Sequence, residues 1–204
     1  MKIGPKYKIA KRLGASVFEK TQTQKFALSE ARKSKIRRGG RRKNVSDFGK
    51  QLLEKQKVRF TYGITEKQFR NYIDGVLEMH GVNPAEELHK ALERRLDNVV
   101  ARTTLATTRR GARQMVSHGH ITVNGKKITI PSHKVKVGDV VGVREGSKSA
   151  PLFAAASERM ANATIQGWLK PNPKDLSAEV TDLPTFVATE AAGDLTSVIS
   201  FYSR

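Results

Sequence analysis

Residues 109–118 combine the side chains that are best suited to binding a polyanion. Five of them lie on or beside one face of a predicted helix: Arg109, Arg110, Arg113, Gln114 and His118. A guanidinium carries a rigid fork of donors that matches a phosphate, whereas an amide or an imidazole can reach base edges and 2′-hydroxyls. The opposite face is apolar and suits packing on a core. This pattern predicts a helix face that binds a phosphate backbone.

The alternative is a solvated helix face, which is the usual role of charged helix surfaces. The sequence argues against it, because no acid lies between Asp97 and Asp139 and no ion pair at helical spacing can account for the arginines. Lys126 and Lys127, just beyond a predicted turn, can extend the same basic surface. We therefore favour the binding role.

Other site chemistries find little support in the sequence. There is no cysteine, and His118 and His120 lack the spacing of a zinc finger, so we predict no metal and no other cofactor. Glycine-rich phosphate loops, nucleophile elbows and metalloprotease motifs are missing as well. We expect Asp97, an acid in a basic stretch, to pair with Arg94 or with a neighbouring helix. The sequence therefore predicts no active site and no small-molecule substrate.

Three helix starts lie upstream of the basic helix. Ser46 can cap a helix that runs to about Arg59. Residues 65–68, Thr-Glu-Lys-Gln, form a capping box for the next helix. The pair 83–84, Asn-Pro, opens a third helix, whose apolar stripe continues at helical spacing as far as Val100.

A short sheet is predicted to follow the basic helix. Asn124-Gly125 is a strong hairpin signal between two alternating segments, 121–123 and 126–130, and residues 135–143 add another short strand or two. Residues 151–162 have helical composition, and the segment 163–204 reads as loops with one or two short strands near Val187 and Val198. Helices packed on a small antiparallel sheet make this an α+β protein.

The charge is concentrated in two blocks of the 204-residue chain. The formal net charge is +19, of which residues 1–60 carry +15 and residues 91–150 carry +8, whereas residues 61–90 and 151–204 carry −2 each. Concentrated like charges repel one another unless a partner neutralises them, so we expect a nucleic acid rather than an acidic protein or a lipid surface. No apolar run approaches the ~18 residues of a membrane span, so we predict no membrane partner.

Residues 1–45 are predicted to be a basic arm. Few apolar positions recur there, and the stretch 33–43 cannot bury enough surface to order itself. We expect this arm to become ordered on its polyanionic partner. Together with the basic helix it would form a two-site clamp joined by near-neutral segments.

Three segments resemble a known family. Residues 92–102, 108–118 and 121–125, which include Leu-Asp-Asn-Val-Val, Thr-Arg-Arg-Gly-Ala-Arg-Gln and Ile-Thr-Val-Asn-Gly, are similar to the RNA-binding module named after the fourth protein of the small ribosomal subunit. The flanks 46–59 and 62–70 resemble the N-terminal domain of that ribosomal protein in its bacterial form, and the ending Phe-Tyr-Ser-Arg matches too. The resemblance is strong over about 44–147 and weaker at both ends.

The resemblance implies a domain order and a function. It implies a basic arm at 1–45, a helical N-terminal domain at 46–91, an inserted RNA-binding module at 92–150 with two helices and a short antiparallel sheet, and a segment 151–204 that packs back on the N-terminal domain. The expected function is that of a structural small-subunit protein. It would bind rRNA first, nucleate assembly at a multi-helix junction of the 5′ domain, line the mRNA entry and contribute to translational accuracy.

The expected partners are small-subunit rRNA, neighbouring small-subunit proteins and mRNA. The chain would act as a monomer within a cytoplasmic ribosome, with an organelle ribosome as the alternative. Besides the five residues of the basic helix, the expected rRNA-binding side chains are Arg94, Arg95, Lys126, Lys127, Lys55, Lys57, Arg59, Lys8, Lys11 and Arg12. The mRNA-entry loop of the family would fall on Arg41, Arg42 and Lys43.

Two other function classes compete with this prediction. An rRNA-modifying enzyme, such as a pseudouridine synthase, can carry the same module, but about 55 residues beyond it are too few for a catalytic domain. A basic adaptor for an acidic protein is the third possibility. We predict that the chain is not an enzyme.

Overall fold

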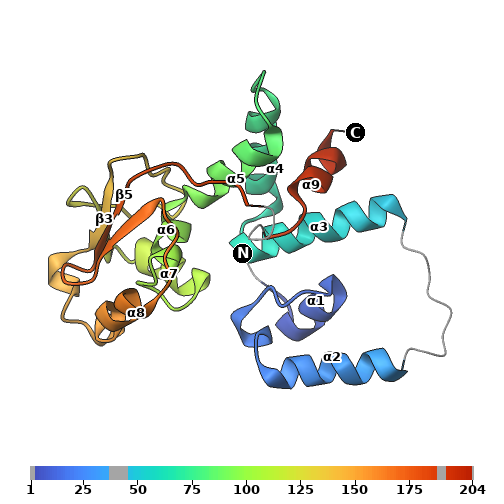
Figure 1. The fold of residues 1–204 in the computed structure, drawn as a ribbon, viewed down its shortest axis with the longest axis horizontal. Coiled ribbons are helices and arrows are strands. Elements are labelled where there is room, and N and C mark those ends of the chain that lie inside the picture. Colours follow the sequence, from blue (N-terminus) through green and yellow to red (C-terminus); the bar gives the residue numbers. More distant parts are fainter. Residues whose placement is uncertain (1–2, 37–45, 188–191, 204) are drawn as a thin grey trace. The chain divides into compact units, whose positions relative to one another are not determined.

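The computed structural model describes residues 3–36, 46–187 and 192–203, and it divides the chain into two compact units (Figure 1). Unit 1 comprises Met1–Ala85 and Val187–Arg204, and unit 2 comprises Glu86–Phe186. Unit 1 is helical in its described part, whereas unit 2 packs helices with a five-stranded sheet. The predicted α+β class is therefore confirmed. None of the described helices is long and apolar enough to cross a membrane.

Unit 1 begins with an ordered helical segment where the sequence predicted an arm. Helix α1 (Lys6–Leu13) ends at Gly14, which has a positive φ of 65°, and is followed by the short helix η1 (Glu19–Thr21) and by α2 (Gln24–Ile36). Ala10, Phe18 and Phe26 form a small core that Phe60 of the next helix helps to cover. The prediction of an arm was wrong for residues 3–36, because widely spaced apolar residues suffice for this core. Residues 37–45 lie outside the described part.

Helices α3 (Asp47–Tyr62), α4 (Glu66–Leu77) and α9 (Leu195–Tyr202) complete unit 1. The two predicted caps are confirmed: Ser46 Oγ accepts the Gly49 N–H, and Thr65 and Gln68 make a reciprocal capping box. Helix α9 lies along α3 (Figure 1), so the chain from residue 187 onward belongs to unit 1, whereas residues 151–186 of the segment predicted to return belong to unit 2.

Unit 2 opens with helices α5 (Pro84–Glu93, beginning in unit 1), α6 (Leu96–Arg102) and α7 (Arg109–Ser117). The apolar stripe read as one continuous helix is split at Arg94-Arg95. There the extended backbone of Arg95 makes a β-bridge to Lys134, and the Leu96 N–H donates to the His133 carbonyl. Thr108 caps α7 by accepting the Gly111 N–H.

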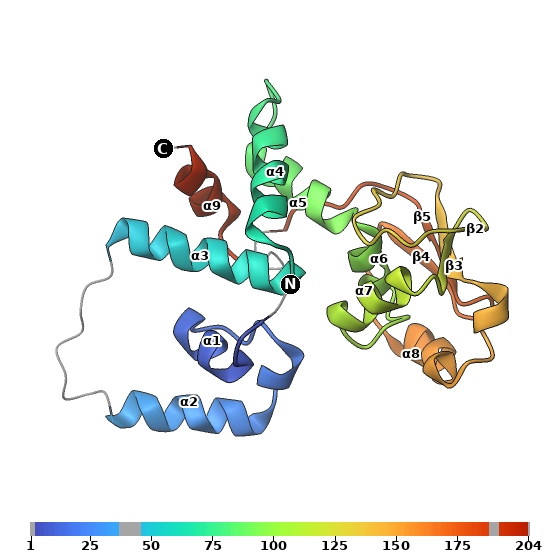
Figure 2. The same cartoon turned by 180° about the vertical axis from the view of Figure 1, so that it is seen from behind.

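The sheet has the strand order β2-β1-β3-β5-β4, and every pairing is antiparallel (Figure 2). Its strands are β1 (Ile121–Val123), β2 (Lys126–Lys127), β3 (Val140–Val143), β4 (Leu169–Asn172) and β5 (Ser177–Val180). The Asn124-Gly125 hairpin is confirmed, with φ of 50° and 76° at its two turn residues. Strand β2 is shorter than predicted, and Ile130 is 60% exposed beyond it.

The predicted domain boundary at residue 150 differs from the structure. The short helices η3 (Glu145–Ser147) and η4 (Pro151–Phe153), helix α8 (Ala156–Asn162) and the hairpin β4–β5 all belong to unit 2. Phe153, Met160 and Trp168 fill its core, and β5 pairs with β3. The strand predicted near Val198 is wrong, because that residue is buried in helix α9.

Candidate nucleic-acid interface

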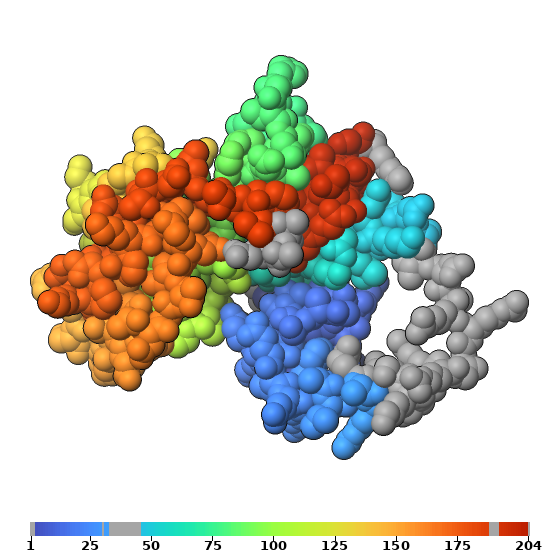
Figure 3. All heavy atoms as spheres, in the orientation of Figure 1, coloured from blue at the N-terminus to red at the C-terminus, as the bar shows by residue number. Residues whose placement is uncertain are grey.

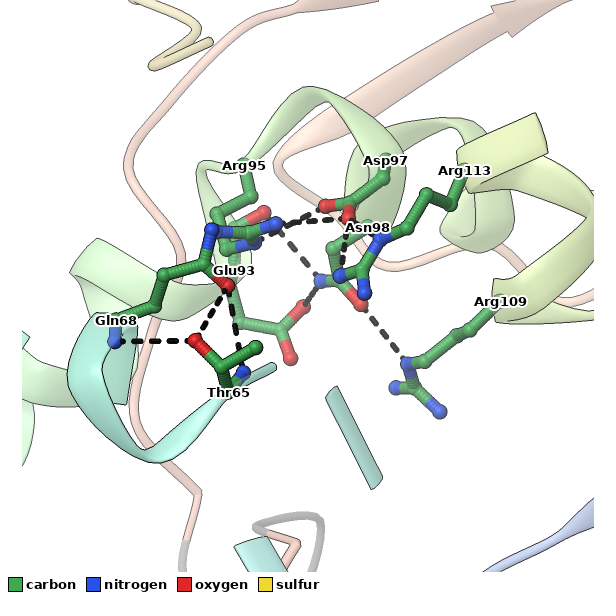
Figure 4. Close-up of polar contacts among 8 residues, drawn as sticks. All are labelled: Thr65, Gln68, Glu93, Arg95, Asp97, Asn98, Arg109 and Arg113. Carbon is green, nitrogen blue, oxygen red and sulfur yellow. Dashed lines mark hydrogen bonds and ion pairs between the residues drawn. The ribbon is translucent and has the colours of Figure 1, made fainter. Parts of the chain in front are cut away.

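A buried carboxylate lies between two of the predicted RNA-binding arginines. Asp97 accepts hydrogen bonds from Arg95, whose Nε and Nη2 atoms lie 3.0 and 2.8 Å from its oxygens. It also accepts from Arg113 of α7, whose Nη2 lies 2.6 Å from Asp97 Oδ2 (Figure 4). The side chains of Arg95 and Asp97 are 3% and 5% exposed. Asp97 therefore fixes both guanidiniums, and its predicted partner on a neighbouring helix is confirmed.

A second buried carboxylate performs the same task for other residues. Glu93, whose side chain is fully buried, accepts hydrogen bonds from Arg102 at 2.9 and 2.8 Å and from Asn98 Nδ2 at 2.6 Å. Asn98 Oδ1 in turn accepts the Nε–H of Arg109 at 2.9 Å (Figure 4). Buried charges are stable only when paired and hydrogen-bonded, and these two carboxylates satisfy that condition through α6 and α7.

The two carboxylates give some of the predicted RNA-binding arginines a structural role. Arg109 and Arg113 are half-buried and hold α7 to the residues before it, and their contact with RNA stays a prediction. Arg95 was predicted to bind RNA but is buried in its ion pair. Arg94 is half-buried, and its Nε donates to the Val135 carbonyl rather than to Asp97, so that predicted pair was wrong. Sequence spacing could not show this, because the acid pairs across two helices.

The exposed part of the basic surface is narrower. On α7, Arg110, Gln114 and His118 are exposed, and in the adjoining hairpin so are Lys126 and Lys127. We call these five residues the α7–hairpin face. Gly119, with φ of 75°, connects the helix to the sheet, and a Cβ there would lie 2.4 Å from the Lys127 Cε. The lysine side chain therefore passes directly over this glycine.

The hairpin turn that carries these lysines is held by a side-chain network. Asn124 Oδ1 accepts the Val140 N–H at 2.8 Å, and Asn124 Nδ2 donates to Asp139 Oδ1 at 2.8 Å. Asp139 Oδ2 also accepts the Lys136 N–H at 2.7 Å. These contacts tie the β1–β2 turn to the start of β3, so the lysines stand on a fixed turn.

In unit 1, three predicted RNA-binding cations have acidic partners. Lys55 and Arg59 of α3 lie 2.7 and 3.2 Å from the carboxylate of Glu66, and Lys57 pairs with Glu54. The Lys55 side chain is 8% exposed, and its ammonium also lies 4.8 Å from the centre of the Phe201 ring. Lys55 therefore anchors α9 and α4 to α3 and does not present its charge at the surface.

The same carboxylate has a perturbed pKa. Burial raises the pKa of Glu66, but the hydrogen bonds from Lys55 and Tyr202, together with the charges of Lys55 and Arg59, outweigh it, so the pKa lies below its ordinary value. Burial and the Glu66 hydrogen bond raise the pKa of the Tyr202 hydroxyl well above its ordinary value. Glu66 thus stays ionised and Tyr202 stays protonated at neutral pH.

The remaining predicted residues lie near the N-terminus. Lys8 and Arg12 of α1 are exposed, and the half-buried Lys11 donates to Ser29 Oγ at 2.5 Å. Arg41, Arg42 and Lys43 lie outside the described residues. The predicted contacts of these residues with RNA stay predictions.

The histidines have different surroundings in the described part of the chain. No group of three or more His, Cys, Asp or Glu side chains there is arranged to hold a metal ion. His120 lies 3.1 Å from the Ser147 hydroxyl and packs edge-on to Phe153, whereas His118 is exposed.

Two important residues were missed in the sequence. Glu93 and Asn98 carry the second buried network, yet neither was assigned a role from the sequence. A signal for Glu93 was available, because it lies three residues before Leu96 and seven before Val100 of the predicted apolar stripe, where a solvent-exposed acid is not expected.

The comparisons with known proteins cover nearly the whole chain. Residues 1–93 match the model of the ribosomal protein S4/S9 N-terminal domain, and residues 94–141 match that of the S4 domain. The small ribosomal subunit protein uS4 of Roseiflexus castenholzii is 44% identical over 204 residues, which cover 99% of this chain and 98% of the relative. The uS4 proteins of Chloroflexus aurantiacus and Desulforamulus reducens are 42% and 40% identical, and each match covers at least 98% of both chains.

Proposed function

The chain belongs to the ribosomal protein S4 family, and we propose that it is a structural protein of the small ribosomal subunit that binds rRNA through the α7–hairpin face. The observation that carries this proposal is that some basic residues of α7 are held by buried polar groups while others are exposed. The buried Asp97 neutralises Arg113 and the amide oxygen of Asn98 holds Arg109, while Arg110, Gln114 and His118 stay exposed beside two exposed lysines.

The chemistry of this face suits the backbone of an RNA helix. Arg110 and the two lysines can neutralise phosphates, while the amide of Gln114 and the ring of His118 can reach 2′-hydroxyls in the shallow minor groove. The face is held rigidly, since α7 is tied to α6 and the hairpin turn to β3. A rigid face loses less side-chain freedom on binding.

The finer parts of the proposal follow from the family resemblance. We infer that the bound RNA is a multi-helix junction of the 5′ domain, that binding there nucleates assembly, and that the chain contributes to accuracy beside neighbouring proteins in a cytoplasmic ribosome. Arg41, Arg42 and Lys43 would lie at the mRNA entry. Changing these three to glutamate should slow mRNA loading onto reconstituted subunits without weakening rRNA binding.

The rRNA-binding proposal is tested by titrating the full chain against an rRNA fragment that contains this junction, at several salt concentrations. Arg110→Glu combined with Lys126→Glu should weaken binding at least tenfold. It should also flatten the dependence of log K on log salt by about 0.7–0.9 for each phosphate that the variant no longer neutralises. Arg109 and Arg113 do not suit this test, because changing them would disturb the buried carboxylates.

Lys174→Glu is the matched control. Lys174 is exposed in the β4–β5 turn of the same unit, at the opposite edge of the sheet from β2. It changes the net charge in the same direction without touching the α7–hairpin face. The loss of affinity for the rRNA fragment is compared after division by the number of lysines or arginines changed. If Lys174→Glu lost as much as the double variant on this scale, the net charge of the chain would attract RNA without a defined site, and the proposed face would be wrong.

The alternative, an rRNA-modifying enzyme, receives no specific support. The matched relatives are named as ribosomal proteins, and the matches extend over nearly their full length. Turnover of uridine to pseudouridine by the purified chain on unmodified rRNA would establish the alternative.

A further inference from the structure

A small hollow on unit 1 lies apart from the α7–hairpin face. Tyr7 and Lys11 of α1 line it on one side, and Lys25, Phe26 and Ser29 of α2 line it on the other. Figure 3 shows α1 and α2, in blue, packed against each other. The volume is about 250 Å³, below the roughly 300–1,000 Å³ of sites for drug-sized ligands. A group smaller than a drug-sized ligand fits such a volume.

One wall of the hollow is an aromatic ring held in place. Tyr7 is 47% exposed, whereas Phe26, which also lines the hollow, is 6% exposed and belongs to the small core of unit 1. The two ring centres are 6.0 Å apart, with an angle of 37° between the planes. The fixed ring of Phe26 thus lies beside Tyr7, and part of the tyrosine ring stays exposed for stacking.

The other walls supply positive charge. The half-buried Lys11 is positioned by its hydrogen bond to Ser29, and Lys25 lies on the rim. Residues 1–36 contain ten Lys and Arg residues and two acids. An open aromatic ring flanked by ammonium groups is the arrangement with which proteins hold single-stranded nucleic acid, since bases stack on the ring and cations neutralise the phosphates.

We propose that this hollow binds one unpaired nucleotide of RNA, its base stacked on Tyr7 and its phosphate against Lys11 and Lys25. A base in an A-form helix is stacked on both sides and cannot enter, so the hollow selects a bulge or a loop. The inference rests on the proposed function, because it assumes that the partner is RNA. It adds a second recognition mode to the α7–hairpin face, which addresses the backbone of a helix.

The test uses a five-residue RNA of uridines with 5-iodouridine at its centre, which crosslinks to a stacked aromatic ring on illumination. With the full chain, the crosslink should map by mass spectrometry to Tyr7 or Phe26. Excess unlabelled single strand should abolish it, and an RNA duplex of equal phosphate content should compete at least fivefold less well. Crosslinks scattered over the lysine-rich surface would overturn the proposal.

Three variants separate stacking from folding. Tyr7→Phe should keep the crosslink yield within twofold. Tyr7→Leu keeps apolar bulk but removes the stacking face, and should lower the yield and the affinity for the pentamer at least fivefold, as should Tyr7→Ala. Leu28→Ala, which changes a 61% exposed residue of the same helix pair, is the control for an indirect effect on folding.

The outcomes for the hollow and for the α7–hairpin face are distinguishable. If Tyr7→Leu binds the pentamer like the parent chain while Arg110→Glu with Lys126→Glu still weakens junction binding, the hollow is not a nucleotide site and the proposed function stands. If neither variant affects its RNA, both proposals fail.

Discussion

The two units neutralise their basic residues in different ways. In unit 2, Glu93 and Asp97 are buried and each is surrounded by donors from neighbouring segments. In unit 1, Glu66 is 44% exposed, and its cationic partners also contact aromatic rings. A buried carboxylate fixes a guanidinium rigidly, and removing it lowers the free energy of unfolding strongly. The ion pair of a half-exposed carboxylate contributes less to stability, and salt screens it. Unit 2 should therefore respond more strongly to loss of an acid.

Asp97→Ala is the most severe test of this difference. It leaves the Arg95 guanidinium buried without its carboxylate, and we expect the free energy of unfolding to fall by about 3–5 kcal/mol. Urea denaturation of the full chain, followed by circular dichroism, measures the change. Asp47→Ala, which removes an ion pair whose side chains are 67% and 85% exposed, is the control and should cost less than about 1 kcal/mol. Equal losses would remove the distinction between buried and exposed acids.

Replacing one glycine by alanine in each unit compares how closely neighbouring atoms pack against the backbone there. In unit 2, Gly119→Ala places a methyl group 2.4 Å from the Lys127 Cε at a φ of 75°. We expect a loss of about 1–2 kcal/mol and a displaced lysine. In unit 1, Gly75→Ala lies within helix α4 with nothing inside 4 Å, and should stabilise by about 0.5–1 kcal/mol. Thermal unfolding of both variants decides the signs.

Tyr202→Phe tests how much the hydrogen bond to the half-exposed Glu66 contributes to the stability of unit 1. The substitution removes the hydroxyl that donates to Glu66 and keeps the ring that packs edge-on against Phe69. We expect a loss of about 0.5–1.5 kcal/mol. Proteolysis of α9 at a fixed protease concentration should speed up accordingly. A loss as large as that of Asp97→Ala would show that unit 1 depends on its half-exposed acid as much as unit 2 does on its buried ones.

The smallest expected effect is a pH dependence at Glu66. Its pKa in the folded chain lies below its ordinary value of 4.5. A lowered pKa means that the stabilisation is complete above 4.5 and is lost as the pH falls through the lower, folded value. Between neutral pH and about pH 2, the stability of Glu66→Gln should therefore fall less than that of the parent chain. Parallel curves would show that Glu66 does not contribute to acid sensitivity.

Local signals in the sequence predicted local structure well. Ser46, the Thr65–Gln68 capping box and the Asn124-Gly125 turn each satisfy or direct backbone groups within four residues, so short spacing was enough to find them. Features that depend on residues far apart in the sequence could not be predicted from short spacing. The end of unit 2 depends on β5 pairing with β3, more than 30 residues away in the chain.

The candidate interface shows the same limit. The sequence indicated the correct helix, and Arg110, Gln114 and His118 are exposed as expected. It could not tell them from Arg109 and Arg113, because the residues that hold those two arginines belong to the preceding helix. The small core at Ala10, Phe18 and Phe26 was missed for a similar reason, since its covering residue, Phe60, lies in a later helix.

The insertion of unit 2 between residues 85 and 187 of unit 1 has a consequence for synthesis of the chain. Helix α3 packs against α9, which follows unit 2 in the sequence. At about 5–20 residues per second, the roughly 100 residues of unit 2 take some 5–20 s to translate. During that interval the side of α3 that α9 covers stays open. Unit 2 can therefore fold first, and the unit that begins the chain is completed last.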